Sequence, residues 1–410
     1  MTADHRTFVI IGAGFAGAKA AEALRERGFD GRVVLIGEEP ERPYERPPLS
    51  KGYLTGDAGK DSVFVHDEDF YAKQSVELRT GTGVTSLDPA GRTISLSDGS
   101  RLRFDKALLA TGSEARRLTV PGSELAGVHH LRTKADADAL ATAAATASSA
   151  VVIGAGWIGS EVAASLRTRG LPVTIVEPAS LPLERVLGRE VGAVYRDLHA
   201  GHGVALRLGD GVAALHGTGR VEEVLTTSGA RIPADLVVAG IGATPRIRLA
   251  ADAGLTVGDG VVTDEFLRTS HPDIYAAGDI AAAWHPLFRG RLRVEHWANA
   301  LNQGPAAAAG MLGAGEAYDQ VPYFFSDQYD LGMEYTGHCP EWDRVVFRGT
   351  LGTDGFLAFW LRDGVVAAAM NANVWDVSDQ LQQLVRARVR VPEQRLTDPD
   401  VPVEALLTAE

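Results

Sequence analysis

Near its start the chain reads Phe8-Val-Ile-Ile-Gly-Ala-Gly-Phe-Ala-Gly17, and the same pattern returns as Val151-Val-Ile-Gly-Ala-Gly-Trp-Ile-Gly159. Both copies consist of an apolar run, which predicts a strand, followed by glycines spaced G-x-G-x-x-G. The first glycine lets the strand turn tightly into a helix, the second lets backbone approach a pyrophosphate, and the third lets the helix pack on the sheet. These roles fall on Gly12, Gly14 and Gly17, and again on Gly154, Gly156 and Gly159.

Each copy continues in the way a dinucleotide-binding unit requires. A second strand-like run follows at residues 32–36 or 172–176, and an acidic residue, Glu38 or Glu177, closes it. Such a carboxylate accepts hydrogen bonds from ribose hydroxyls, while free N–H groups at the helix start hold the phosphates. One G-x-G-x-x-G alone could be a plain glycine turn. Two complete copies indicate that the chain binds two dinucleotides.

The acid of the second copy favours NADH over NADPH at that site. Glu177 is followed by Pro-Ala-Ser rather than by an arginine, and its carboxylate would repel the 2′-phosphate of NADP. Arg185 and Arg189 lie further along and leave a phosphate pocket open as the alternative. With NADH at the second site, we expect a tightly bound flavin nucleotide at the first.

Composition excludes several other classes of function. The net charge of −13 over 410 residues disfavours nucleic-acid binding. The single cysteine, Cys339, allows no intramolecular disulfide, no CxxC pair and no multi-cysteine metal site, and we expect no metal. The sequence has no apolar run long enough to span a bilayer and no apolar signal region. We therefore expect a protein of the cytoplasm without a membrane partner.

Four further segments resemble a known family. They are Pro43-Tyr-Glu-Arg-Pro-Pro-Leu-Ser-Lys51, Ala107-Leu-Leu-Ala-Thr-Gly112, Thr269-Ser-His-Pro-Asp-Ile-Tyr-Ala-Ala-Gly-Asp279 and Glu295-His-Trp297. They look like segments of FAD-dependent pyridine-nucleotide oxidoreductases. Most closely they resemble the NADH:ferredoxin reductases of bacterial oxygenase and cytochrome P450 systems, of the putidaredoxin reductase and biphenyl dioxygenase ferredoxin reductase type, to which apoptosis-inducing factor is related.

The resemblance covers nearly the whole chain and implies its fold and reaction. The fold would be α/β, with two Rossmann-like nucleotide-binding domains of the glutathione-reductase type and a C-terminal α+β interface domain. The implied domains are an FAD-binding domain at 1–112 and 244–320, an NAD-binding domain at 113–243 and an interface domain at 321–410. Non-covalent FAD would pass electrons from NADH singly to a [2Fe-2S] ferredoxin that serves a P450 or ring-hydroxylating oxygenase.

The resemblance also implies the residues of both sites. For FAD these are Gly12, Gly14, Ala16, Gly17, Glu38, Arg46, Lys51, Val84, Thr111, Gly112, Arg132, Asp279 and Trp297. For NAD they are Gly154, Gly156, Ile158, Gly159, Glu161, Glu177 and Gly242. From the residues alone, Asp279 could instead cap the next helix, and Val84 and Arg132 read only as a strand residue and a surface arginine.

A Lys51–Glu161 pair beside flavin N5 is the catalytic hypothesis that this resemblance supports. The local alternative for Glu161 is a glutamate in the first helical turn that complements the helix dipole. A second hypothesis concerns the protein partner: Arg289, Arg291 and Arg293 alternate along a predicted strand, so one face would be basic and could attract a ferredoxin. A solvated surface face is the alternative for this cluster.

One departure from the family pattern leaves the identity of the electron acceptor undecided. Residues 323–330 read Tyr-Phe-Phe-Ser-Asp-Gln-Tyr-Asp, with Phe325 where close relatives in the family have Trp. The alternatives are an NADH-responsive binding or signalling flavoprotein like apoptosis-inducing factor, or a reductase for a rubredoxin or a quinone. In all these cases we expect a monomer or a weak dimer.

Overall fold

The two glycine fingerprints lie in different units of the chain. The computed structural model describes residues 5–407, which pack as two units. The first unit contains residues up to 45, 61–114 and 244–322, and the second contains 46–60, 115–243 and residues from 323 onward. The domain boundaries expected from the sequence stay a prediction, and the segments 46–60 and 323–407 group with the second unit.

A five-stranded parallel sheet forms the centre of the first unit. Its strands, in spatial order, are β20 (Ile274–Ala276), β7 (Lys106–Leu109), β1 (Thr7–Ile11), β2 (Arg32–Ile36) and β3 (Val76–Arg79). The register pairs Phe8 with Val33 and Ile11 with Ile36, so both fingerprint runs lie side by side and end at one edge. Near-continuous apolar runs are typical of parallel strands that are buried on both faces.

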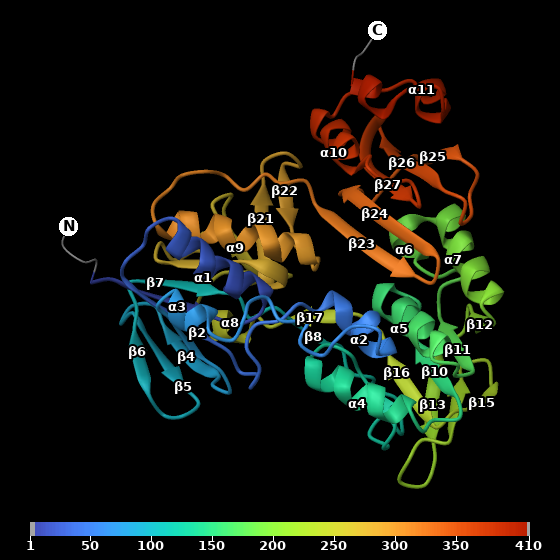
Figure 1. Cartoon of the computed structure of the whole chain (residues 1–410), viewed down its shortest axis with the longest axis horizontal. Helices are drawn as coiled ribbons and strands as arrows, with labels where there is room; N and C mark the ends of the chain where they lie inside the picture. Colours follow the sequence, from blue (N-terminus) through green and yellow to red (C-terminus); the bar gives the residue numbers. More distant parts are fainter. Residues whose placement is uncertain (1–4, 408–410) are drawn as a thin grey trace. The chain divides into compact units, whose positions relative to one another are not determined.

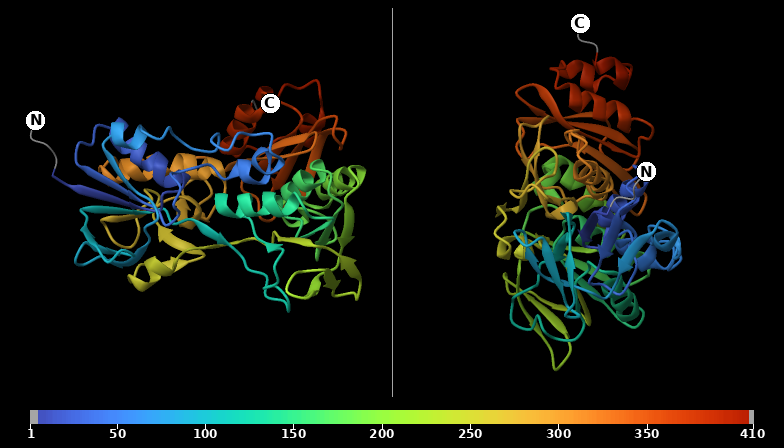
Figure 2. Two further views of the ribbon diagram at one scale, coloured as in Figure 1. Left: turned by 60° about the horizontal axis from the view of Figure 1, so that its bottom comes forward. Right: turned by 90° about the vertical axis from the view of Figure 1, so that its left-hand side faces the viewer.

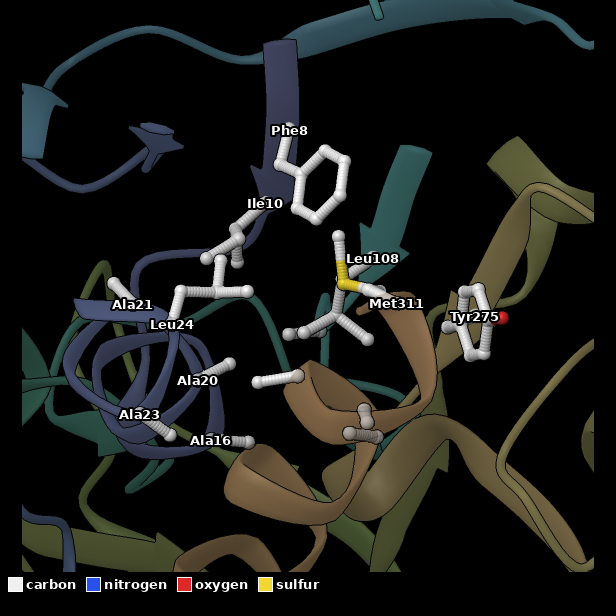
Figure 3. Packing of buried hydrophobic residues seen from close by; sticks show 14 of the residues in the cluster. Phe8, Ile10, Ala16, Ala20, Ala21, Ala23, Leu24, Leu108, Tyr275 and Met311 are labelled. Carbon is white, nitrogen blue, oxygen red and sulfur yellow. The ribbon is translucent and has the colours of Figure 1, made fainter. Parts of the chain in front are cut away.

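Two helices cover one face of this sheet. They are α1 (Phe15–Glu26) and α9 (Trp297–Met311). Figure 3 shows Ala16, Ala20 and Leu24 of α1 lying with Met311 below Phe8 and Ile10 of β1. The small side chains let the helices approach closely: a Cβ added to Gly304 of α9 would lie 2.5 Å from the backbone oxygen of Ala16.

Smaller sheets complete the first unit. The opposite face of the main sheet packs against the cyan sheet of Figure 2, which contains β4 (Val84–Asp88), β5 (Thr93–Leu96) and β6 (Arg101–Arg103). A four-stranded sheet contains β18 (Val257–Gly258), β19 (Gly260–Thr263), β21 (Ala281–His285) and β22 (Gly290–Leu292). Short helices are α3 (Phe70–Lys73), α8 (Arg248–Asp252) and the 3-10 turn η2 (Gly278–Ile280). β8 (Ser113–Ala115) and β17 (Ala243–Pro245) form a separate two-stranded sheet.

The second unit repeats the nucleotide-binding architecture. Its parallel sheet contains, in spatial order, β12 (Ala205–Leu208), β11 (Val173–Glu177), β10 (Ala150–Ile153), β16 (Leu236–Ala239) and β9 (Val128–His129). The helices of this part are η1 (Pro47–Ser50), α2 (Gly52–Thr55), α4 (Lys134–Ala144), α5 (Trp157–Thr168), α6 (Glu184–Leu187) and α7 (Arg189–Gly201). A small antiparallel sheet contains β13 (Val212–His216), β14 (Glu223–Thr226) and β15 (Arg231–Pro233). α4 begins with a capping box between Thr133 and Asp136.

An antiparallel sheet and helices form the C-terminal part of the second unit, drawn in orange and red in Figure 1. The spatial order is β23 (Tyr323–Gln328), β24 (Leu331–Gly337), β27 (Val365–Ala372), β26 (Phe356–Arg362) and β25 (Arg344–Gly349). The helices are α10 (Ser378–Ala387), α11 (Glu393–Thr397) and the 3-10 turn η3 (Val403–Leu407). One face of the sheet shares a core with α7, in which Trp360 and Tyr195 are the largest fully buried side chains.

These elements confirm the predicted fold class. Each fingerprint joins the central strand of a parallel sheet to the helix that follows it, and an antiparallel sheet with helices ends the chain. This is the α/β class with two Rossmann-like parts and a C-terminal α+β part. None of the helices described between residues 5 and 407 has the length and apolar character needed to cross a bilayer.

Candidate functional site

The glycine turn of the first unit leaves room where a phosphate would lie. Gly12 has φ of +115°, and an added Cβ there would lie 2.2 Å from the backbone oxygen of Ala110. An added Cβ on Gly17 would lie 2.0 Å from the Gly12 oxygen, whereas one on Gly14 has no described atom within 4 Å. Among the described residues, no side chain caps α1 and no acid lies in its first turn. The N–H groups of this turn therefore suit an anion.

Glu38, the acid of the first unit, lies close to other predicted FAD contacts at the same edge of the sheet. Glu38 pairs with Arg246 at 2.8 Å, and its side chain is 70% exposed. An added Cβ on Gly83, beside Val84, would lie 3.9 Å from the Glu38 side chain. Thr111 donates from Oγ1 to the backbone oxygen of Arg246 at 3.2 Å. A carboxylate held but exposed at this edge can accept hydrogen bonds from a ribose.

The remaining first-unit residues surround the start of α9. Trp297 stacks on Phe15, with ring centroids 5.2 Å apart, and its Nε1 donates to Glu45 at 2.9 Å. Asp279 lies in η2 directly after β20, and no side-chain hydrogen bond caps that turn among the described residues. Ala16 is buried on α1 and Gly112 has φ of +65°. The N-cap residue of this turn is Ala277, so Asp279 lies inside the turn and not at its cap.

The second unit contains the same glycine geometry. Gly154 has φ of +95°, and an added Cβ would lie 2.5 Å from the Gly240 oxygen. An added Cβ on Gly159 would lie 2.0 Å from the Gly154 oxygen, whereas one on Gly156 again has no described atom within 4 Å. Ile158 is 44% exposed beside this opening. Gly242, three residues after the end of β16, has φ of +100°.

The second acid is fixed beside the glycine turn. Glu177 accepts from the backbone N–H of Ala155 at 2.6 Å and from that of Ala179 at 2.8 Å. Arg189, considered above for a 2′-phosphate, instead pairs with Glu184 at 2.9 Å. The carboxylate at the ribose position and the occupied arginine both favour NADH over NADPH.

Lys51 and Glu161 form an ion pair within the second unit. Lys51 Nζ lies 2.7 Å from Glu161 Oε2, and the two side chains are 18% and 5% exposed. Ser50 Oγ donates to Glu161 Oε2 at 2.5 Å and Ser326 Oγ donates to Oε1 at 2.8 Å. Phe325, the residue that departs from the family pattern, lies with its ring centroid 5.7 Å from Lys51 Nζ.

The position of Glu161 differs from one expectation of the sequence. Glu161 is the fifth residue of α5 and is buried, and none of the first-turn residues of α5 is acidic. It is therefore not an exposed first-turn glutamate that complements the helix dipole. Its hydroxyl partners Ser50 and Ser326 have no direct signal in the sequence, because both lie far from Glu161 along the chain and only the tertiary fold joins the three residues.

Arg46 and Arg132, two of the predicted FAD contacts, lie together in the second unit. The Arg46 guanidinium donates to the backbone oxygen of Arg132. Arg132 N and Thr133 N both donate to the Asp136 carboxylate, which fixes the segment before α4. These hydrogen bonds fix the backbone of Arg132, and the sequence alone did not predict them.

The prediction that Arg289, Arg291 and Arg293 form one basic face of a strand is wrong for Arg293. Arg293 lies outside β22, is 14% exposed and pairs with Asp259 and Glu295. Arg291 lies in β22 opposite Trp284 of β21, which is 39% exposed, and Arg289 precedes the strand with φ of +50°. The exposed patch is therefore Arg289, Arg291 and Trp284, and the sequence analysis missed the tryptophan.

The residues present fit the two nucleotides. Both turns have space beyond their middle glycine, uncapped N–H groups and an acid at the end of the next strand, among the described residues. This donor set matches a pyrophosphate followed by a ribose.

Cys339 is buried, and burial raises the pKa of its thiol to about 11. Its Sγ donates a hydrogen bond to the Glu341 backbone oxygen.

Comparisons with known proteins agree with this geometry. The family model described as pyridine nucleotide-disulphide oxidoreductase matches residues 6–304, and the model described as reductase C-terminal matches residues 323–407. Rhodocoxin reductase of Rhodococcus erythropolis is 42% identical over 354 residues, which cover 86% of this chain and 83% of that protein.

Two further similarities extend over nearly the whole length. The ferredoxin reductase component of chlorobenzene dioxygenase from Cupriavidus sp. (strain PS12) is 41% identical over 389 residues, covering 95% of this chain and 94% of that protein. The crystal structure of the covalent putidaredoxin reductase–putidaredoxin complex contains a chain with a TM-score of 0.95 and 36% identity, with 98% of each chain covered.

Proposed function

Since this chain belongs to the pyridine nucleotide-disulphide oxidoreductase family, we propose that it is an NADH-dependent ferredoxin reductase of an oxygenase system. The reaction takes two electrons from NADH and delivers them singly to a [2Fe-2S] ferredoxin that serves a P450 or a ring-hydroxylating oxygenase. Bound FAD supplies the conversion between two-electron and one-electron steps. The proposed location is the cytoplasm, where NADH is produced.

The observation that carries this proposal is the presence of two complete glycine cradles in a chain without a reactive thiol. Each cradle has its close backbone approaches at the first and third glycine and open space at the second. Cys339 is the only cysteine, and its raised pKa of about 11 keeps it a thiol at neutral pH. Disulfide chemistry, which part of this family performs, therefore has no reactive pair in this chain.

We assign the residues of this chain to three tasks. The N–H groups of the two glycine turns bind the pyrophosphates, and Glu38 and Glu177 orient the ribose groups. Arg46, Val84, Thr111, Gly112, Arg132, Asp279 and Trp297 complete the FAD site, and Ile158 and Gly242 complete the NADH site. Lys51 and Glu161 form the charged pair at the place where hydride is transferred, and their ion pair fixes both groups.

The test of this function is reduction of a ferredoxin by NADH. We expect the purified protein to be yellow, to be bleached by NADH under anaerobic conditions, and to reduce cytochrome c much faster when a [2Fe-2S] ferredoxin is added. Protein that binds no FAD would contradict the proposal. Slow reduction without stimulation by ferredoxin would instead favour the signalling flavoprotein named above.

Charge reversal of the exposed patch should weaken the use of ferredoxin. The double substitution Arg289→Glu and Arg291→Glu removes the two exposed cations beside Trp284, so an acidic ferredoxin should dock less well. We expect KM for ferredoxin to rise by about tenfold at low ionic strength, an effect that added salt should reduce. Ferricyanide reduction by NADH should not change, and an equal loss of both activities would contradict docking at this patch.

A further inference from the structure

A line of buried polar side chains continues from Glu161 into the core of the second unit. Ser326 Oγ donates to Glu161 Oε1 at 2.8 Å, and Gln328 Nε2 donates to Ser326 Oγ at 3.3 Å. His199 Nε2 lies 2.9 Å from Gln328 Oε1. Ser326, Gln328 and His199 are each 1% exposed or less, and Glu161 is 4% exposed. Buried polar groups in such a line depend on one another for their hydrogen bonds.

Every donor in this line points toward Glu161. Gln328 donates with its amide N–H to Ser326, so its carbonyl oxygen accepts from the N–H at Nε2 of His199. Burial lowers the pKa of His199 to about 4, and the ring is therefore neutral at neutral pH. Its Nδ1 has no hydrogen-bond partner within the described part of the chain. The line thus begins at a neutral imidazole and ends at a carboxylate.

Separate segments of the second unit supply these groups. Glu161 lies on α5, His199 in the last turn of α7, and Ser326 and Gln328 on β23. Ser326 and Gln328 are two residues apart on a strand, so they lie on the same face of the sheet. The same face contributes Phe324, which packs on Trp157 at the start of α5 with ring centroids 4.8 Å apart. β23 therefore brings both polar groups to the helix that carries the glutamate.

The two oxygens of the Glu161 carboxylate have different partners. Oε2 accepts a hydrogen bond from the Ser50 hydroxyl and pairs with the Lys51 ammonium group, and Oε1 accepts a hydrogen bond from the Ser326 hydroxyl. A carboxylate held at both oxygens cannot rotate about its terminal bond without breaking a hydrogen bond. Loss of the Ser326 hydroxyl would leave Oε1 of a buried charged group without its donor, which favours rotation of the group.

We propose that Ser326, Gln328 and His199 are positioning residues that hold the Glu161 carboxylate oriented toward Lys51 for reduction of the protein by NADH. This inference rests on the function proposed above for the Lys51–Glu161 pair. Ser326 acts directly on the carboxylate, Gln328 orients the Ser326 hydroxyl, and His199 orients the Gln328 amide. The C-terminal sheet thereby contributes to the NADH reaction through the interior of the second unit.

The test compares Ser326→Ala with a conservative and a control variant. Ser326→Ala should lower the limiting rate of FAD bleaching by NADH roughly tenfold, as expected for loss of one hydrogen bond to a charged group, with little change in Kd for NADH. Ser326→Thr, which keeps the hydroxyl, should restore the rate. Thr336→Val is the control, because that buried hydroxyl on the neighbouring strand has no hydrogen-bond partner in the described residues.

Infrared spectroscopy of the holoprotein gives a readout that does not depend on turnover. Ser326→Ala should show a shifted carboxylate band that is lost in the double variant Ser326→Ala/Glu161→Gln. Gln328→Met should move rate and spectrum in the same direction by a smaller amount, which keeps the test open if Ser326→Ala does not fold. Rates and spectra like those of the wild type, or an equal loss in Thr336→Val, would overturn the inference. A wild-type protein that NADH does not bleach would overturn the proposed function instead.

Discussion

Glu161→Gln should slow the reduction of this protein by NADH by about a hundredfold or more, the range typical of a side chain that acts directly at the reacting groups. The substitution keeps the size of the side chain and removes its charge. Lys51, only 18% exposed, then loses the carboxylate that lies 2.7 Å from its ammonium group. The substitution removes the partner of the Lys51 ammonium group at the proposed site of hydride transfer. The rate of reduction should therefore fall more than the affinity for NADH.

Stopped-flow bleaching of the FAD absorbance by NADH measures this effect. Bleaching by dithionite should stay unchanged, because that reductant does not use the NADH site. Glu190→Gln is the matched control: Glu190 is an exposed glutamate in the first turn of α7, in the same unit. If Glu161→Gln is bleached by NADH at the wild-type rate, the pair is structural and has no part in the reaction.

Gly17→Ala should abolish FAD binding and destabilise the first unit. The added Cβ would lie 2.0 Å from the backbone oxygen of Gly12 and 3.2 Å from the Ile10 side chain, so α1 must move away from the sheet. Such overpacking lowers the free energy of unfolding by roughly 1–3 kcal/mol. The shift also displaces the N–H groups that would hold the pyrophosphate. Thermal unfolding and the FAD content per chain measure the two effects.

Gly14→Ala separates the two effects, because it changes the same turn without a clash. Gly14 has φ of −83°, and an added Cβ has no described atom within 4 Å. We expect the apoprotein of this variant to unfold at the wild-type temperature and to bind FAD weakly, since the methyl group enters the space proposed for the pyrophosphate. A Gly17→Ala protein as yellow and as stable as the wild type would contradict the close packing of α1 on β1.

Much of the fold could be predicted because its signals are local. The two glycine turns, the strands on either side of them and the acids Glu38 and Glu177 lie within short stretches of sequence, and strand and helix periods decide which side chains are buried. α4 also begins with a local feature, the capping box between Thr133 and Asp136. The resemblance of four longer segments supplied the expectation of FAD, NADH and ferredoxin.

The candidate site was less predictable, because its contacts join distant segments. The hydroxyl groups of Ser50 and Ser326 reach Glu161 across 111 and 165 residues of sequence. The basic face was wrong at Arg293 because alternation along a strand cannot reveal that Asp259 and Glu295 neutralise one of its cations. Trp284 escaped notice because only the pairing of β21 with β22 places it opposite Arg291.

The two dinucleotide cradles and the lack of a reactive thiol pair follow from the amino-acid sequence, because glycine spacing and cysteine number are properties of the chain alone. Which charged groups are paired and which are exposed depends on folding. The environment of Glu161 is made by α5, by the segment around Lys51 and by β23, which are brought together when the unit folds. Charge and hydrogen bonding depend on distances between such segments, and sequence spacing does not contain those distances.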